Sequence, residues 1–318
     1  MIERYRGQRV AVATLHGKAE ALAPALGPLG LMLEAVPLDT DALGTFAGDV
    51  ERPGSAREVV VEKARRGMAM SGCALGIATE GSFGPDPLLG FLPRHEELLA
   101  FVDDVHGQVI VIEHFGHDTN WVSKPIAPGE DLMARLEPLL AAVGLPTHAA
   151  LVKPNRWLPS APRAETATAA ETDAGAGTGT APRATDPVPA VRMPVAKGLS
   201  TAAAVLDAVE RMAAASADGL ARVEADLRAH MNPTRLRVIA SLGEALRDRL
   251  ATPCPDCGVP GFGRIHVDAG LPCELCGTPT DLVRAEVHGC SACACRVTQP
   301  RGDGRTTADA GHCPECNP

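Results

Sequence analysis

Four Cys-x-x-Cys pairs near the end of this 318-residue chain constrain its fold more than any other feature. A short segment with few apolar side chains needs a cross-link such as a bound metal ion to stay folded, and four thiolates suit tetrahedral zinc. The paired cysteines are Cys254 and Cys257, Cys273 and Cys276, Cys290 and Cys293, and Cys313 and Cys316. We therefore expect residues 251–318 to form a double zinc-ribbon module that holds structural zinc.

The spacing favours a metal site built from consecutive pairs. Cys254/Cys257 and Cys273/Cys276 are separated by a spacer of zinc-ribbon length, and the last two pairs repeat the arrangement. Cys295 is left over and could replace Cys293 as a ligand. Iron is the alternative metal. A redox role fits less well, because no βαβ pattern surrounds the pairs.

Composition narrows the classes of partner. A net charge of −9 and 3% aromatic residues argue against a nucleic-acid binder. The cysteine-rich module is itself net acidic, so a protein partner is the better expectation for it. No apolar run is long enough to span a membrane, and the start of the chain lacks a signal-peptide pattern. Cysteine-rich metal chemistry suits a reducing compartment, so we expect a cytoplasmic protein.

Residues 55–84 predict a helix followed by a buried strand. Ser55 and Glu58 form a capping-box pattern that starts a helix, and Gly72 ends it. The apolar stretch from Cys73 to Ala78 is typical of a parallel strand. Glu80 would follow at the carboxyl end of this strand, where open α/β sheets bind ligands.

A pattern typical of an anion-binding site lies near the start of the chain. The strand predicted at residues 9–15 leads through the turn at His16-Gly17-Lys18 into a helix expected at about residues 19–29. Backbone amides at a helix start and a lysine charge both favour phosphate. An ordinary turn with a solvated lysine is the alternative.

Residues 9–90 resemble the inosine triphosphate pyrophosphatases and their septum-inhibitor relatives. The motifs that carry the resemblance are Ala13-Thr14, Gly17-Lys18, Glu58, Lys63-Ala64 and Glu80-Gly81-Ser82. The chain departs from that family at Val59, where the family has Asn, and at Thr79, where many members have an acid. The family's later Ser-His-Arg motif is absent. The resemblance implies hydrolysis of a nucleoside triphosphate between its α and β phosphates.

Two functional hypotheses follow. In the first, the protein is a metal-dependent nucleotide phosphohydrolase. Glu58 and Glu80 would bind magnesium, Lys18 and Lys63 would offset the triphosphate charge, and Gly17 and Ser82 would contact phosphate. In the second, the protein is a non-enzymatic zinc-ribbon adaptor or ligand-binding protein. Glu58 would then only cap its helix, and Lys63 would be a surface residue.

The remaining patterns define the expected architecture, which is α/β. Residues 1–157 predict a three-layer domain with a mixed sheet, and residues 158–194 a disordered linker rich in Pro, Ala, Thr and Gly. Residues 195–250 predict a helical hairpin, broken at Asn232-Pro233. Its polar corner, which includes Arg235, is interpreted as a capped corner with surface ion pairs, and an anion or partner site is the alternative. We expect the cluster of His114, His117 and Asp118 to lie on a surface loop.

The whole layout also resembles an uncharacterised bacterial family, known only as a domain of unknown function. The stretches that carry this likeness are GTFAGDVERPGS, IATEGSFGPDP, DLRAHMNPTR, CPDCG and PCELCG. This second resemblance implies no activity.

Overall fold

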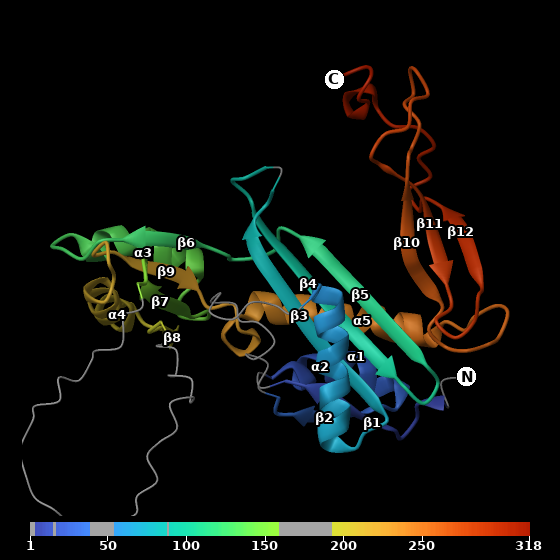
Figure 1. Ribbon diagram of the computed structural model, residues 1–318, viewed down its shortest axis with the longest axis horizontal. Coiled ribbons are helices and arrows are strands. Elements are labelled where there is room, and N and C mark those ends of the chain that lie inside the picture. Colours follow the sequence, from blue (N-terminus) through green and yellow to red (C-terminus); the bar gives the residue numbers. More distant parts are fainter. Residues whose placement is uncertain (1–3, 15–16, 39–53, 88, 159–192) are drawn as a thin grey trace, which may run out of the picture. The chain divides into compact units, whose positions relative to one another are not determined.

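The computed structural model describes residues 4–14, 17–38, 54–87, 89–158 and 193–318. The chain forms two compact units (Figure 1). Unit 1 combines residues 1–121 with 227–318, and unit 2 comprises residues 122–226. The expected boundary at residue 157 is therefore wrong, because residues 122–154 belong with residues that follow the predicted linker.

Unit 1 is built on a mixed five-stranded sheet. In sheet order its strands are β2 (Met32–Val36), β1 (Arg9–Ala13), β3 (Leu75–Pro85), β4 (Pro93–Asp103) and β5 (Gln108–Gly116). The first three are parallel, whereas β4 and β5 are antiparallel to their neighbours. The expectation of an α/β domain with a mixed sheet is confirmed.

Helices cover both faces of this sheet. Helices α1 (Lys18–Leu26) and α5 (Pro233–Ala251) pack on one face, over a core that includes Leu22, Ile77 and Ile239. Helix α2 (Ala56–Ser71) covers the other face, over Ala78 and other small or branched side chains. Figure 1 shows α2 in front of the sheet and α5 behind it. Unit 1 also contains the short 3₁₀ helices η2 (Gly27–Leu29), η4 (Ala229–Met231) and η5 (Ala310–His312).

Local signals set the helix ends as expected. The Ser55 side chain accepts from the Glu58 amide while Glu58 accepts from the Ser55 amide, and Gly72 ends α2 in the left-handed conformation. Asn232 caps α5 by accepting from the Arg235 amide, with Pro233 at the first helical position.

Strand β3 is longer than expected. Its pairing with β1 stops at Ile77, but pairing with β4 continues from Leu75 to Pro85. Glu80, Gly81 and Ser82 therefore lie within a strand and not in a loop after it. The antiparallel partner extends the strand beyond the point where the parallel one ends.

The C-terminal segment adds a three-stranded antiparallel sheet to unit 1. Its strands are β10 (Gly263–Ala269), β11 (Val283–Gly289) and β12 (Arg296–Pro300). The Gln108 side chain, at the start of β5, donates a 2.5 Å hydrogen bond to the Pro260 carbonyl, and Arg249 of α5 donates to the Gly261 carbonyl. These contacts attach the segment to the α/β core.

Unit 2 contains a four-stranded antiparallel sheet and two helices. The strands in order are β6 (Ser123–Ile126), β9 (Ala221–Ala225), β7 (Ala150–Pro154) and β8 (Ala196–Leu199). The helices are α3 (Leu132–Val143) and α4 (Ala202–Ala214). Among the helices of the described ranges, none is long and apolar enough to cross a membrane.

The expected helical hairpin at residues 195–250 is wrong. The chain leaves α4 and turns at Gly219, which has φ 69°, and Ala221, Val223 and Ala225 are then buried alternately as strand β9. Burial at every second position is the period of a strand and not of a helix. Helix α5 belongs to unit 1, whereas α4 belongs to unit 2. The predicted linker falls almost entirely at residues 159–192, outside the described residues.

Candidate functional site

The strand order of unit 1 creates a switch point between β1 and β3. Helix α1 follows β1 on one face of the sheet, and α2 precedes β3 on the other. The helices beside these two strands therefore lie on opposite faces, and open α/β sheets bind ligands beside such a point. Charged side chains gather at this point.

Lys18 lies at the switch point, on the first turn of α1. It is half-buried, and its Nζ donates a 3.3 Å hydrogen bond to the Thr79 carbonyl, two residues beyond the last β1–β3 pair. Burial, followed by the positive charge of Arg235, lowers the pKa of Lys18 to about 7. Within the described part of the chain, no carboxylate is hydrogen-bonded to it.

Lys63 and Glu80 form a buried ion pair on the α2 face. Their N–O distance is 2.6 Å, and their side chains are 6% and 7% exposed. Lys63 is therefore not the surface residue of the adaptor hypothesis. A buried carboxylate beside a lysine is already neutralised, so Glu80 faces a cation and not another acid.

A second buried ion pair lies on the opposite face of the sheet. Arg235 of α5 donates to both carboxylate oxygens of Glu97 on β4, at 2.8 and 2.9 Å. His95 contacts the same carboxylate at 3.0 Å. Burial would raise the pKa of Glu97, but the charge and hydrogen bonds of Arg235 and the hydrogen bond of His95 outweigh it and lower the pKa.

Gly81 makes this second pair possible. A Cβ built on Gly81 would lie 2.5 Å from Glu97 Oε2 and 2.7 Å from an Arg235 nitrogen. Residues alternate between the two faces of β3, so Gly81 faces α5 while Glu80 faces α2. The missing side chain leaves the space that the guanidinium fills.

The two pairs and Lys18 form one electrostatic cluster. The charges of Arg235, Glu97, Lys63 and Glu80 all act on the Lys18 ammonium group. Each carboxylate is hydrogen-bonded to a different cation, which leaves Lys18 as the positive excess. Around Lys18 this arrangement can attract an anion but is not balanced to hold a cation.

Polar groups without a carboxylate complete the surroundings of Lys18. The Thr79 hydroxyl is buried and has no hydrogen-bond partner among the residues described here. Gly17, with φ 67°, is the N-cap of α1 and offers no side-chain cap. The expected phosphate ligand Ser82 is half-buried on β3, opposite Glu96, on the same face as Glu80.

The structure does not bring Glu58 into this cluster. Glu58 is exposed at the start of α2, where hydrogen bonds from the Ser55 side chain and amide lower its pKa. In the described ranges, groups of three or more metal-ligating side chains occur only at the cysteines. The carboxylate set expected for magnesium is therefore not assembled by these residues, and Glu58 acts as a helix cap.

Sequence reasoning missed Glu97, His95 and the role of Arg235. Arg235 was expected in a surface ion pair, but its side chain is only 2% exposed. The capping pattern at Asn232 correctly located the start of α5. Nothing near position 235 in the sequence, however, indicates a partner on β4.

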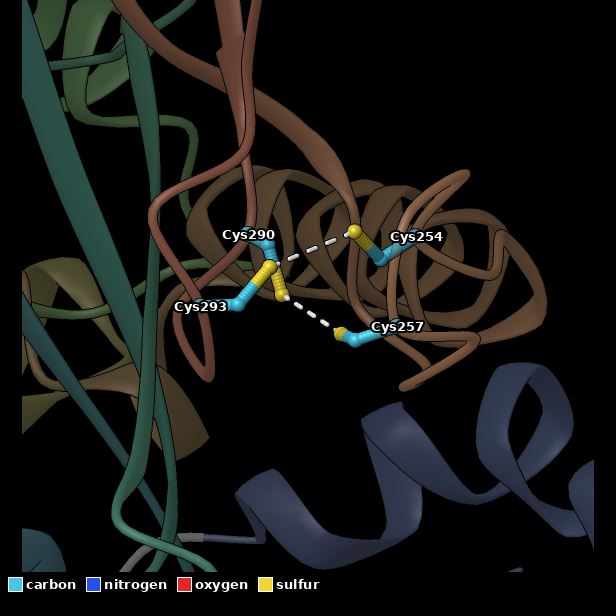
Figure 2. A group of neighbouring side chains, drawn as sticks. All are labelled: Cys254, Cys257, Cys290 and Cys293. Carbon is cyan, nitrogen blue, oxygen red and sulfur yellow. Dashed lines mark hydrogen bonds between the residues drawn. The ribbon is translucent and has the colours of Figure 1, made fainter.

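The eight predicted cysteine ligands form two quartets. Cys254, Cys257, Cys290 and Cys293 form the first, and Cys273, Cys276, Cys313 and Cys316 the second; within each, all four sulfurs lie within 4.8 Å of one another. Figure 2 shows the first quartet with its sulfurs turned toward a common centre. Both groups could hold a metal ion.

The sulfur spacing fits tetrahedral thiolate coordination. Cys254 and Cys293, like Cys257 and Cys290, have sulfurs 3.7 Å apart. In the second quartet the Cys273–Cys316 and Cys276–Cys313 distances are 3.9 and 3.5 Å. A tetrahedral ion with metal–sulfur bonds of about 2.3 Å would space its ligands about 3.8 Å apart. Disulfide sulfurs would instead lie at about 2.05 Å.

The quartets are interleaved, which corrects the expected pairing of consecutive motifs. The first pair joins the third, and the second joins the fourth. The β10–β11 hairpin returns the chain from the second pair to the first quartet, so sheet pairing and not spacer length selects the partners. Cys293 belongs to the first quartet, and Cys295 is buried beside it against Phe262.

Backbone hydrogen bonds close the turns of the first two Cys-x-x-Cys pairs. The amides of Gly258 and Gly277 each donate 2.9 Å hydrogen bonds to the carbonyl of the first cysteine of their pair, at φ 70° and 75°. Hydrogen bonds with the hydroxyl and amide of Thr278 lower the pKa of Cys276 to about 6, whereas hydrogen bonds with Cys276 and Cys313 raise the pKa of Cys316. A thiolate at neutral pH is the form that binds metals.

Comparison with known families gives one match. The family described as a domain of unknown function (DUF6671) matches residues 63–161 and 193–318. The matched ranges include Lys63, Glu80, Glu97, Arg235 and both quartets, whereas Lys18 and Glu58 lie before them. No curated protein matches the chain.

Proposed function

We propose that this chain, which belongs to the DUF6671 family of unknown function, binds a phosphate-bearing small molecule of the nucleotide class at the β1–β3 switch point. The observation that carries the proposal is the position of Lys18. It is a half-buried cation at a helix start, and within the described residues it contacts a carbonyl and no carboxylate. An anion would supply the charge that the cluster lacks.

The rest of the cluster supports this assignment. Lys63 and Arg235 neutralise Glu80 and Glu97, so the two carboxylates do not repel an incoming anion as free charges would. The Thr79 hydroxyl is a buried donor without a described partner. The choice of nucleotides among phosphate esters rests on the resemblance of residues 9–90 to the inosine triphosphate pyrophosphatases.

Hydrolysis of the bound nucleotide is the second candidate function. Glu80 favours it, because its negative charge acts on the Lys18 ammonium group and a carboxylate can orient a water molecule. Binding of the phosphate group at Lys18 does not require magnesium. If no phosphate compound binds, the adaptor hypothesis, in which the protein is a non-enzymatic zinc-ribbon protein, takes its place.

The experiment is a calorimetric titration of nucleoside triphosphates, pyrophosphate and inorganic phosphate into the full chain. Lys18→Met should remove binding, while Lys18→Arg should retain part of it. Lys124→Met, at an exposed lysine of unit 2, is the matched control and should bind like the wild type. Equal affinity of the Lys18→Met and wild-type proteins would overturn the proposal. Release of pyrophosphate, measured with and without magnesium, separates hydrolysis from binding alone.

We further propose that zinc occupies both cysteine quartets in a structural role. Four thiolates without an open position match the closed zinc sites that stabilise small domains. The segment has few large buried side chains besides Phe262 and Leu271, so metal binding would supply much of its folding free energy. Elemental analysis of the purified protein should give about two zinc ions per chain. Iron in place of zinc would correct the metal, and absence of both would overturn the assignment.

A further inference from the structure

A histidine on β4 is oriented in the way that metal-binding histidines are. Arg235 holds Glu97 as an ionised carboxylate, which can only accept hydrogen bonds. His95 Nε2 lies 3.0 Å from that carboxylate, so Nε2 must carry the proton. In a neutral ring the lone pair is then on Nδ1. A carboxylate behind a histidine is the usual second shell of a metal ligand.

The free nitrogen of His95 is buried without a partner. His95 is 0% exposed, and Nδ1 has no hydrogen-bond partner within the described ranges. Phe83 stacks on the ring at a centroid distance of 4.3 Å and an interplanar angle of 15°. Stacking contacts a face of the imidazole and supplies no hydrogen bond to Nδ1, which lies in the plane of the ring. A histidine that served only packing would be expected to satisfy this nitrogen.

A second histidine with an unpartnered nitrogen lies beside it. His114 on β5 is half-buried, and its Nε2 also lacks a partner among the described groups. Gly116 lies directly opposite His95, and a Cβ there would be 3.2 Å from His114 Nε2. His114 therefore leans over the glycine toward His95. This placement corrects the expectation of a surface-loop histidine.

The separation of the two rings fits a shared metal ion. With metal–nitrogen bonds of about 2.0–2.1 Å and a tetrahedral angle, two imidazole centroids would lie about 5.2 Å apart. The His95 and His114 centroids are 5.5 Å apart, at an interplanar angle of 58°.

We propose that His95 Nδ1 and His114 Nε2 bind one divalent transition-metal ion, distinct from the metals of the cysteine quartets. Imidazole ligands suit zinc, copper, nickel and iron. Two protein ligands leave positions open to water or to a further ligand, as in catalytic rather than structural sites. Asp118 and Glu97 are the carboxylates whose charges act on His114.

The test is calorimetric titration of Zn²⁺ into the full chain after both cysteine quartets have been filled with zinc. One additional binding event is expected for the wild type. His114→Gln should weaken this event by about tenfold or more, and His95→Gln should do the same. His117→Gln is the matched control, because His117 is an exposed neighbour whose Nδ1 already bonds the Pro93 carbonyl.

The variants separate the possible outcomes. Should His95→Gln fail to fold, the half-buried His114 still decides the question. No additional event in the wild type, or equal affinity in wild type and His114→Gln, overturns the proposal. A crystal structure of zinc-saturated protein with only a water between the two nitrogens would do so as well. None of these results depends on nucleotide binding at Lys18.

Discussion

Arg235 and Glu97 lie 138 residues apart in the chain and form a two-point ion pair, with side chains 2% and 0% exposed. The guanidinium also donates to the Leu227 carbonyl at 2.8 Å. The pair joins α5, which follows unit 2 in the chain, to β4, which precedes it. The pair therefore links the two chain segments that form unit 1, next to the candidate site.

Arg235→Met should destabilise unit 1 strongly. The substitution leaves Glu97 buried without its cation, which costs about 3–5 kcal/mol. Arg65→Met removes an exposed pair with Asp104 and should cost at most about 1 kcal/mol. Denaturant unfolding of both variants measures the difference. Equal stability of the two would mean that the buried pair is not formed.

Gly81→Ala should be destabilising, whereas Gly84→Ala in the same strand should be tolerated. The new methyl group at position 81 would overlap Glu97 and Arg235, and such overpacking costs about 1–3 kcal/mol. Nothing lies within 4 Å of a Cβ at Gly84. Thermal unfolding of the two variants provides the comparison, and a similar loss in both would point to backbone effects in place of steric overlap.

Anion binding at Lys18 should weaken as the pH rises. The pKa of Lys18 is lowered from 10.5 to about 7, so the free protein loses this charge above neutral pH. A bound anion restores the proton, and binding at pH 8 should therefore take up protons from the buffer. Titrations in two buffers of different ionisation enthalpy measure this uptake, which Lys18→Met should lack.

The same shift affects stability with the opposite trend. Between pH 7 and 10.5 the unfolded chain keeps the Lys18 proton and the folded chain releases it. The unfolded state then binds more protons, so this group makes folding more favourable as the pH rises through that window. Lys18→Met should flatten this part of the stability profile, measured by denaturant unfolding at several pH values.

Paired cysteine substitutions should reveal the interleaved quartets. Cys254→Ser with Cys290→Ser damages one quartet and should leave about one metal per chain. Cys254→Ser with Cys273→Ser damages both and should leave none. Sequential pairing would give the reverse result. Cys295→Ser is the control and should retain both ions, counted by elemental analysis.

Signals within a few residues located the helix ends correctly. The Ser55–Glu58 capping box and the Asn232-Pro233 start of α5 depend on hydrogen bonds between residues three positions apart. The eight cysteines were likewise recognisable as ligands, because each Cys-x-x-Cys turn forms from adjacent residues. The presence of two four-cysteine sites could therefore be predicted, but their partners could not.

Contacts between distant strands decided the rest. The β10–β11 register brought Cys290 to Cys254, and the extension of β3 along β4 placed Gly81 against Glu97. Residues 221–225, which were expected to be helical, form strand β9 because β6 and β7 pair with them. Sequence by itself determined the capped helices and the ligand-bearing turns, since their hydrogen bonds close over short loops. Only the tertiary structure decided which cysteines share a site and which cation faces Glu97, because both depend on sheet register between segments far apart in the chain.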